Sequence, residues 1–278
     1  MRPSYRVAPR SLAASQPRSV RLVRGSAKTP ARSQQLFRPS LGASLAICGR
    51  SREKGERAAQ GLRALGGEVR CHALDVRDAD ALLAAMDQTG QDLGPIHTLV
   101  AGAAGNFPCR AEDLSPNGFK TVIDIDLLGA FNAARSAFGQ LKQTQGNAIF
   151  ISAGQSFMPY AFQAHVGAAK AGIDQMMRDL ALEWGPHGIR CNSIAPGPID
   201  GTEGVKRLVP EDMRPHLERA IPLGRFGTVE EMGQVAVFLA SPLASYVTGS
   251  LLVADGGQNL PGSGIWTQAI MQGAGPGT

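Results

Sequence analysis

Lys170 has the sequence surroundings that most clearly point to chemistry in this chain of 278 residues. It falls in the first half of a predicted helix, and its neighbours are all small: Gly167, Ala168, Ala169, Ala171 and Gly172. A solvated surface lysine is the alternative, but it explains this setting poorly. An ammonium group within a site favours the ionised form of a nearby acid. We therefore expect Lys170 to belong to a functional site.

Other polar residues follow predicted strands. Arg50 and Ser51 come directly after one strand, Asp75 ends the next, and Asp255 stands in an Asp-Gly-Gly turn after the last. In open parallel sheets, ligands bind outside the carboxyl ends of the strands. These turns are therefore the places where a binding site is expected.

The elements that would position these residues alternate between short apolar strands and longer helical segments. The predicted strands are Ser44–Cys48, Val69–Leu74, His97–Ala101, Asn147–Ser152, Ile189–Ile194 and Ser250–Ala254. Each is separated from the next by enough chain for a crossover helix, which makes successive strands parallel. The sequence predicts an α/β fold of the doubly wound, Rossmann-like kind in a single domain.

Helix boundaries are also readable. Ser51 is expected to cap a helix that ends at Gly66 and Gly67, and Ser115 to open a long one. In the segment 157–185, apolar residues recur at helical spacing and predict a face buried in the core or in a subunit interface.

The charge is divided unequally along the chain. Residues 1–52 contain 11 Lys and Arg and no acid, whereas residues 53–278 contain 17 Lys and Arg against 23 Asp and Glu. The net charge of +5 therefore combines a basic head with an acidic body and does not indicate nucleic-acid binding. We divide the chain into an atypical basic segment at 1–42, one main domain at 43–260 and a C-terminal tail at 261–278.

Two further classes are disfavoured by the sequence. No apolar run approaches the roughly 18 residues of a membrane helix, so no membrane span is predicted. The four cysteines lack the spacing of a zinc site or a disulfide framework, so neither a metal nor a disulfide is expected.

Seven phrases occur in a fixed order in the turns: GRS (49–51), LDV (74–76), AGAAGNF (101–107), DIDLLGAFN (124–132), HVGAAKAG (165–172), RCNSIAPGPIDGTEG (190–204) and SPLASYVTGSLLVADGG (241–257). Together they resemble the short-chain dehydrogenase/reductase family over residues 43–260. AAGNF, QAHVGAAKAG and APGPIDGTEG resemble its 2,4-dienoyl-CoA reductases, especially the peroxisomal type and its bacterial relatives.

The resemblance implies NADPH as the cofactor. Arg50, where an NAD enzyme usually carries an acid, suits the 2′-phosphate of NADP, and Ser51 adds a hydrogen bond. Asp75 would accept from the adenine amino group and Val76 would offer its backbone amide. Gly102 lets the backbone approach the cofactor closely.

The remaining cofactor contacts are also carried over by resemblance. Lys170 would hold the nicotinamide ribose. Pro196, Gly197 and Ile199 would surround the nicotinamide carboxamide, and Thr202 would lie near the pyrophosphate.

The catalytic set departs from the usual family pattern. The position of the usual Tyr, four residues before Lys170, is Val166, and the position of the usual Ser is Ala153. Dienoyl-CoA reductases are the branch that works without that Tyr. The resemblance implies Asp126 as the acid that organises proton delivery, with Lys170 setting its electrostatics and Asp255 as a further catalytic acid.

Substrate contacts are expected from Asn106, Phe107 and His165, with structural packing as the alternative for His165. Tyr160 lies ten residues before Lys170, off that helix face, and is not expected to replace the missing acid. The segment 200–222 is expected to form a lid over the substrate.

The head is the least family-like part. A short-chain reductase begins with a strand and a TGxxxGxG turn that holds the pyrophosphate. Ser19–Val23 can form that strand and Gly25 can begin the turn, but the other glycines are missing and two prolines interrupt any helix. Three explanations account for the missing glycine turn. The head is a mitochondrial-type targeting segment, the gene model is incorrect there, or the chain is a real variant without nucleotide binding.

The leading hypothesis is NADPH-dependent reduction of 2,4-dienoyl-CoA to 3-enoyl-CoA in fatty-acid β-oxidation. The alternatives are another acyl-CoA or 3-oxoacyl reductase and a pseudoenzyme that has lost dinucleotide binding. The expected partners are an acyl-CoA substrate and copies of this chain in a homotetramer. The expected location is cytoplasmic, or mitochondrial if the head is a transit peptide.

Overall fold

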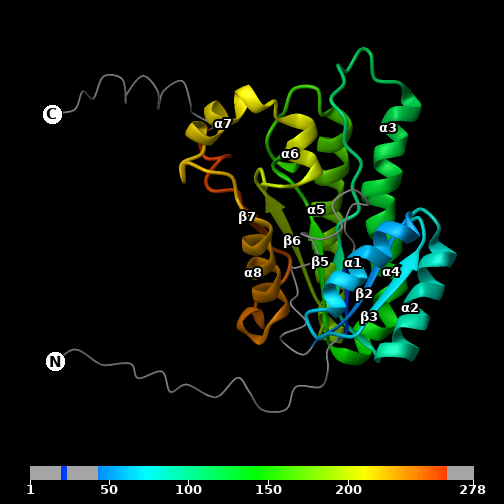
Figure 1. Cartoon of the computed structure of the whole chain (residues 1–278). Helices are drawn as coiled ribbons and strands as arrows, with labels where there is room; N and C mark the ends of the chain where they lie inside the picture. The colour runs from blue at the N-terminus through cyan, green and yellow to red at the C-terminus, as the bar shows by residue number, and fades with distance from the viewer. Residues whose placement is uncertain (1–19, 24–42, 262–278) are drawn as a thin grey trace, which may run out of the picture.

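The computed structural model describes residues 20–23 and 43–261, which form a parallel sheet covered by helices on both faces (Figure 1). The sheet has seven strands in the order β3-β2-β1-β4-β5-β6-β7. The strands are β1 (Val20–Val23), β2 (Ser44–Gly49), β3 (Val69–Ala73), β4 (Ile96–Ala101), β5 (Asn147–Ile151), β6 (Arg190–Pro196) and β7 (Leu251–Ala254). All neighbouring strands run parallel. The predicted fold class is confirmed, with strand ends displaced by one or two residues.

The first strand lies in the middle of the sheet. Val20 pairs with Ser44 of β2 on one side, and Val23 pairs with Val100 of β4 on the other. The strand predicted at Ser19–Val23 is therefore present in the structure as Val20–Val23. The predictions about the glycine turn and the two prolines fall between residues 24 and 42, outside the described residues.

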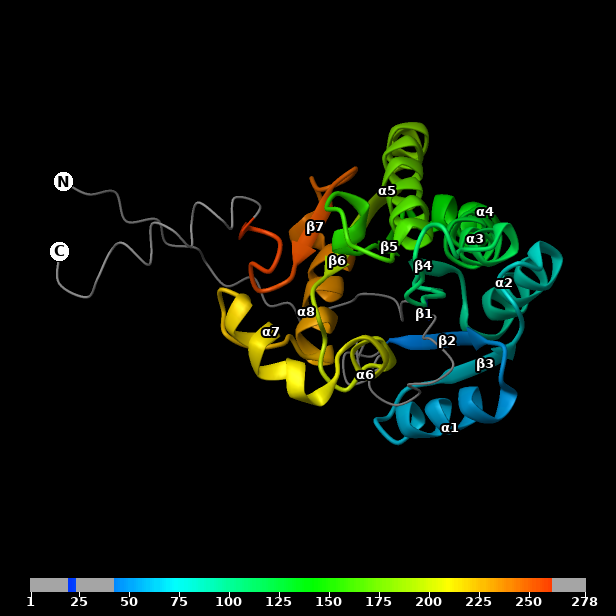
Figure 2. The same cartoon turned by 90° about the horizontal axis from the view of Figure 1, so that it is seen from above.

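Two helical layers cover the sheet (Figure 2). On one face, Leu62 and Leu239 pack against the strands, and on the other, Leu141 and Met177 do so. Met177 belongs to the predicted apolar face, which lies in the core. The first layer contains α1 (Arg52–Arg63) and α8 (Val229–Ala240), and the second contains α2 (Ala79–Leu93), α4 (Gly129–Thr144) and α5 (Ala164–Trp184).

Two predicted helix starts are confirmed by their caps. The Ser51 side chain accepts a hydrogen bond from the Lys54 amide at the start of α1, and the Ser115 side chain accepts one from the Gly118 amide. Such caps satisfy amides that have no partner within the helix. The first helix ends at Arg63, three residues before the predicted glycine stop.

The helix predicted to follow Ser115 is interrupted by a π-helical turn. It consists of α3 (Pro116–Ile123), the π-helical turn η2 (Asp124–Leu128) and α4. A π turn holds an extra residue and often marks a functional site. Asp126 lies in this turn and is fully buried.

The carboxyl edge of the sheet carries most of the irregular chain. After β6, the helices α6 (Glu203–Leu208) and α7 (Arg214–Ala220) extend over this edge (Figure 1). Short 3-10 turns occur at η3 (Gly154–Ser156), η4 (Gly185–His187), η5 (Glu211–Met213) and η6 (Pro242–Ala244). Within the described ranges, no helix combines the length and apolarity that a membrane crossing requires.

Candidate active site

A buried pair of opposite charges lies between Asp126 of η2 and Lys170 of α5. Nζ of Lys170 is 3.1 Å from Oδ2 of Asp126, and the two side chains are 6% and 0% exposed. The amide of Gly105 donates to Oδ1 of Asp126 at 2.6 Å, and Nζ of Lys170 donates to the carbonyl of Ile151 at 3.0 Å. The structure thus brings together two of the three predicted catalytic residues.

The strand ends position this pair. Gly105 belongs to the loop after β4, and Ile151 is the last residue of β5, so two neighbouring strand ends each supply one backbone group. Taking two charges out of water is costly unless both are paired and hydrogen-bonded. Sequence reasoning missed Gly105 and the Ile151 carbonyl. For Gly105, the available signal was that it is the second glycine of the phrase AGAAGNF.

Apolar side chains occupy the positions of the usual hydroxyl groups. Val166 is 3% exposed and packs with Val122 and Ala169. Ala153 lies at the wall of a cleft. The neighbouring Ser152 hydroxyl donates to the carboxylate of Asp174 at 2.8 Å and is thereby engaged. The structure therefore has no hydroxyl group at the positions of Val166 and Ala153, as the sequence indicated.

A cleft of about 1290 Å³ opens beside these residues. The segment 199–221 forms one wall, so the predicted lid does border a cavity. The other walls come from the loop between β5 and α5, from the end of β6 and from the last described turn. The described lining residues are Pro108, Ser152, Ala153, Gly154, Gln155, Tyr160, Ala161, Phe162, Gln163, Pro196, Gly197, Pro198, Ile199, Thr202, Gly204, Val205, Val209, Leu217, Arg219, Ala220, Ile221, Gln258 and Pro261.

Tyr160 is one of these lining residues although it is off the helix face of Lys170. Its hydroxyl donates to Oδ1 of Asn259 at 2.7 Å. Burial, followed by the negative charge of Asp255, raises the pKa of Tyr160 above its usual value. The phenol is therefore neutral at pH 7 and is a hydrogen-bond donor in the wall of the cleft. Sequence reasoning missed Asn259, which is 99 residues away.

Asp255 holds the turn that carries Asn259. Its Oδ1 accepts from the Gly257 amide at 2.8 Å, and its Oδ2 accepts from the backbone and side-chain nitrogens of Asn259 at 2.9 and 2.8 Å. Asp255 is not among the described lining residues of the cleft. Its hydrogen bonds are those of an Asx turn, and the catalytic role stays a prediction.

The predicted adenosine contacts lie at the ends of β2 and β3. Ser51 caps α1, and Arg50 is exposed beside it. The carboxylate of Asp75 is held by Arg77 through two side-chain hydrogen bonds of 2.8 and 3.1 Å. These bonds, reinforced by a backbone hydrogen bond from Arg77 and by the charge of Arg50, lower the pKa of Asp75 to about 2. Arg77 was not foreseen as its partner.

Val76, after β3, and Gly102, after β4, lie close together. Both line a small internal space, which Gly129 also borders. A Cβ on Gly129 would lie 2.4 Å from the Val76 side chain, so only glycine lets α4 approach this loop. The Val76 carbonyl accepts from the Asn132 side chain at 3.0 Å, which fixes the loop further.

The predicted nicotinamide contacts form the end of β6 and the turn after it. Pro196, Gly197 and Ile199 all line the cleft. A Cβ on Gly197 would lie 2.7 Å from the Cα of Asp255, so glycine is required where the two turns meet. Thr202 caps α6 by accepting from the Val205 amide, and its hydroxyl donates to the Ile199 carbonyl at 2.7 Å.

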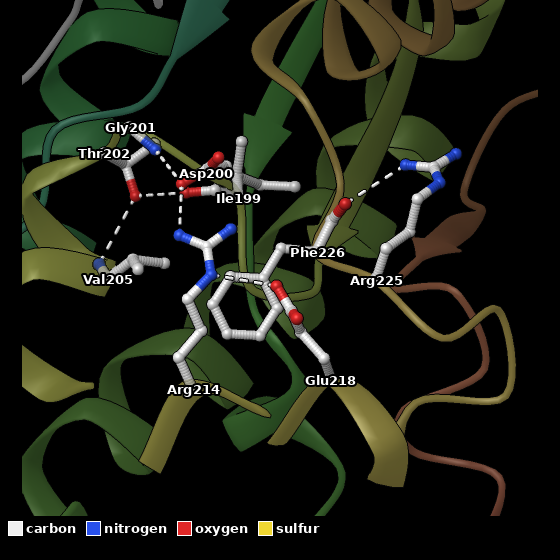
Figure 3. A network of polar contacts seen from close by, with 9 residues as sticks. All are labelled: Ile199, Asp200, Gly201, Thr202, Val205, Arg214, Glu218, Arg225 and Phe226. Carbon is white, nitrogen blue, oxygen red and sulfur yellow. Dashed lines mark hydrogen bonds and ion pairs between the residues drawn. The ribbon is translucent and has the colours of Figure 1, made fainter. Parts of the chain in front are cut away.

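A polar network ties the lid helices to this turn (Figure 3). Arg214 of α7 donates to Asp200 at 3.0 Å and to Glu218 at 2.8 Å. Its guanidinium also lies 4.9 Å from the ring centre of Phe226. Arg225 donates to the Phe226 carbonyl at 3.1 Å. Sequence reasoning missed this network because its members come from separate segments between residues 199 and 226.

The predicted substrate contacts gather where the loop after β4 meets the start of α5. The rings of Phe107 and His165 are 4.5 Å apart, and the Cys109 amide donates to the Phe162 carbonyl. His165 is fully buried, and neither of its ring nitrogens has a hydrogen-bond partner within the described part of the chain. Oδ1 of Asn106 is also buried and has no hydrogen-bond partner among the described residues.

Gln163 belongs to this group and was missed from the sequence. It lines the cleft, it is 8% exposed, and its Oε1 has no partner among the described residues. Buried polar atoms in folded proteins are nearly always hydrogen-bonded to protein or water. Its place two residues before His165 was the available signal.

A doubly wound parallel sheet with its polar residues at the carboxyl edge is the architecture of dinucleotide-binding proteins. A family model described as enoyl-(acyl carrier protein) reductase matches residues 38–259. The chain belongs to the short-chain dehydrogenase/reductase family.

Two similar proteins are both named as 2,4-dienoyl-CoA reductases. The peroxisomal 2,4-dienoyl-CoA reductase [(3E)-enoyl-CoA-producing] of Saccharomyces cerevisiae is 45% identical over 86% of this chain and 83% of its own length. The enzyme of the same name from Danio rerio is 46% identical over 78% of this chain and 73% of its own length.

Solved structures of the family superpose well. A short-chain dehydrogenase from Bacillus anthracis is 34% identical and has a TM-score of 0.78, over 88% of this chain and 98% of its own. An NADPH-bound short-chain oxidoreductase from Pseudomonas aeruginosa, described as containing an atypical catalytic center, is 25% identical and has a TM-score of 0.80, over 86% of this chain and 96% of its own.

The residues present fit a nicotinamide dinucleotide. β1 lies between β2 and β4, where the strand order reverses, and this is where such sheets bind dinucleotides. The exposed guanidinium of Arg50 at the end of β2 suits a phosphate. At the other end, the turn of Gly197 and Ile199 borders an open cleft that can take a planar ring.

Proposed function

We propose that this protein is an NADPH-dependent reductase that converts 2,4-dienoyl-CoA to 3-enoyl-CoA in fatty-acid degradation. One observation carries the proposal: the buried Asp126–Lys170 pair lies near a cleft that Ala153 lines, and the apolar Val166 and Ala153 stand at the positions of the usual Tyr and Ser. The names of the relatives from S. cerevisiae and D. rerio support the same substrate class.

The missing hydroxyl groups distinguish between two reactions. Reduction of a ketone needs an acid that protonates an alkoxide as it forms. Reduction of a conjugated dienoyl thioester instead moves charge to the thioester oxygen and needs a proton at the α carbon. The apolar Val166 and Ala153 therefore favour the second reaction over 3-oxoacyl reduction.

The proposed roles follow from the positions of the residues. When bound, a reduced nicotinamide supplies a hydride, which the far end of the diene accepts. Arg50, Ser51, Asp75, Val76 and Gly102 would hold the adenosine half of NADPH, and Lys170, Pro196, Gly197 and Ile199 the nicotinamide half. Asp126 would organise the water that delivers the proton to the α carbon. The ammonium of Lys170 balances the charge of Asp126 during that step.

The remaining candidates have supporting roles in this proposal. Asn106, Phe107 and His165 would contact the acyl group, because the rings of Phe107 and His165 lie together and Oδ1 of Asn106 and the His165 nitrogens have no partner among the described residues. Asp255 would act through Asn259, which it orients toward Tyr160 in the wall of the cleft.

Titration of the purified protein with NADPH, followed by measurement of reduced-nicotinamide absorbance with a dienoyl-CoA, tests the proposal. We expect saturable binding and oxidation that depends on the dienoyl-CoA. Absence of NADPH binding at millimolar concentration would favour the pseudoenzyme. Oxidation with a 3-oxoacyl-CoA but not with a dienoyl-CoA would defeat the substrate assignment.

We also propose residues 43–260, completed by the central strand β1 (Val20–Val23), as the catalytic unit. We propose that it works in a homotetramer and in the cytoplasm, with the mitochondrion as the alternative location. Exposed apolar side chains favour association of copies through α4 and α5: Phe131 belongs to α4, Leu182 to α5, and Leu128 directly precedes α4. Light scattering gives the number of copies, and imaging of a tagged full chain gives the location.

A further inference from the structure

Gln163 differs from the hydroxyl groups that line the cleft. The hydroxyls of Tyr160, Ser152 and Thr202 donate to Asn259, Asp174 and the Ile199 carbonyl, respectively. Oε1 of Gln163 has no such partner within the described residues, although the atom is buried and the residue is only 8% exposed. An acceptor left unpaired in a buried position costs free energy, so an occupant of the cleft that donates to it gains affinity.

The chemistry of Oε1 restricts that occupant. A side-chain amide oxygen accepts hydrogen bonds and does not donate them, so the occupant must present an N–H or an O–H. The thioester oxygen and the hydrocarbon chain of an acyl-CoA present neither. The pantetheine arm of the same molecule presents two amide N–H groups, the nearer one two carbons from the sulfur.

Arg219 of α7 supplies a second point of recognition. It carries the one charge among the described residues that line the cleft. Its guanidinium lies 2.9 Å from Nδ1 of His216, and no acid pairs with it within the described part of the chain. The two neighbouring arginines differ. Arg214 pairs with Asp200 and Glu218 (Figure 3), and Arg225 pairs with Glu231. A guanidinium without an acid partner is suited to a phosphate group.

We propose that the cleft recognises the carrier of the acyl group at two points: Gln163 accepts a hydrogen bond from a pantetheine amide, and Arg219 pairs with a phosphate of the CoA nucleotide. This inference rests on the proposed function, since it assigns the acyl-CoA to this cleft. Both residues line the cleft, Gln163 directly before α5 and Arg219 in the lid helix α7. A carrier arm that leaves the site through this cleft would contact both.

Three thioesters of 2,4-hexadienoic acid separate the two contacts. The CoA ester has amides and phosphates, the pantetheine ester has amides alone, and the S-ethyl ester has neither. We expect Arg219→Gln to lower kcat/KM about tenfold for the CoA ester and to leave the other two unchanged. We expect Gln163→Leu to lower kcat/KM about tenfold for the CoA and pantetheine esters and to leave the S-ethyl ester unchanged.

Arg70→Gln is the matched charge control, because Arg70 pairs with Asp92 at the far edge of the sheet. All three variants are compared with the unchanged chain by thermal unfolding. Equal losses on all three esters would overturn the proposal. A rise in the Kd for NADPH in Gln163→Leu would instead assign Gln163 to the nicotinamide carboxamide and would also overturn it.

Calorimetric titration with free CoA and with pantetheine gives a readout that does not need turnover. We expect Arg219→Gln to weaken CoA binding about tenfold and to leave pantetheine binding unchanged. If the unchanged chain reduces none of the three esters, the proposed function fails, and the titration still decides the role of Arg219. If the esters are reduced and neither substitution discriminates among them, only the carrier proposal fails.

Discussion

The Asp126–Lys170 pair and the Arg214 network on the lid are both ion pairs within hydrogen-bonding distance, but they differ in exposure. The pair is 0% and 6% exposed, whereas Arg214 and its partner Asp200 are 40% and 51% exposed. Charges in the interior depend on their partners, because a charge that loses its partner stays out of water. Exposed charges are hydrated and screened when a partner is lost, so they contribute little. The two regions should therefore respond to substitution in different ways.

Replacement of Asp126 should have the largest effect on turnover. We expect Asp126→Ala to lower kcat by roughly a hundredfold to a thousandfold, which falls within the usual range for a group that manages proton transfer. The Kd for NADPH should change little, because Asp126 is not among the proposed cofactor contacts. Stopped-flow absorbance for kcat and fluorescence titration for NADPH measure the two quantities.

Asp126→Asn is the matched control for this experiment. It keeps an oxygen that accepts from the Gly105 amide and removes the charge that faces Lys170. If Asp126 organises proton delivery, the Asn variant loses kcat as well. Equal losses of turnover and of NADPH affinity in both variants would show that Asp126 only supports the structure.

Replacement of Lys170 should have the largest effect on stability. Lys170→Met leaves the Asp126 carboxylate buried with one hydrogen bond, from Gly105, and such losses typically cost about 3–5 kcal/mol. The double substitution Asp126→Asn with Lys170→Met removes both charges and should recover most of that loss. Urea unfolding of the single and double variants gives the coupling free energy. Additive effects would break the contrast with the lid, because they would mean that the buried charges do not depend on each other.

Local patterns explain why much of this architecture was predictable. The six strands and the Ser51 and Ser115 caps depend on residues adjacent in sequence, and they lie within one or two residues of where they were expected. The π-helical turn at Asp126 was not predictable. Its apolar spacing is that of a continuous helix, and the buried carboxylate is held by Gly105 and Lys170, which lie 21 and 44 residues away.

The same distinction applies to the site. Lys170 was identified by its small neighbours, and Asp126 and the turn after β6 by resemblance, because these phrases are short and contiguous. Asn259 was missed because its contact with Tyr160 spans 99 residues, and sequence reasoning had set Tyr160 aside by helix spacing alone. Tyr160 precedes α5, so helical spacing does not govern where it points. Such contacts require the folded chain.

Replacement of Arg214 should have a moderate effect, and on substrate binding rather than on folding. Arg214→Gln removes the bonds from α7 to Asp200, so the lid closes over the cleft less favourably. We expect the KM for the dienoyl-CoA to rise roughly twofold to fivefold with kcat nearly unchanged. Steady-state kinetics at low and high salt measures this, and added salt should shrink the difference. A large fall in the unfolding temperature of Arg214→Gln would contradict the view that this network contributes little to folding stability.

The smallest expected effect concerns Glu231 at the start of α8. Hydrogen bonds from Arg225, together with the Thr228 amide, lower the pKa of Glu231 to about 2 from an ordinary value of 4.5. Because the pKa is lower in the folded chain, the ionised carboxylate stabilises the fold above about pH 4.5, and this contribution is lost as the pH falls toward 2. The side chain is 38% exposed, so after screening we expect less than about 1 kcal/mol. Urea unfolding of the unchanged chain and of Glu231→Gln should differ by a constant amount from pH 5 to 7 and converge below pH 4. A difference that grows as the pH falls would give the opposite sign and would remove Glu231 from the set of weak, exposed pairs.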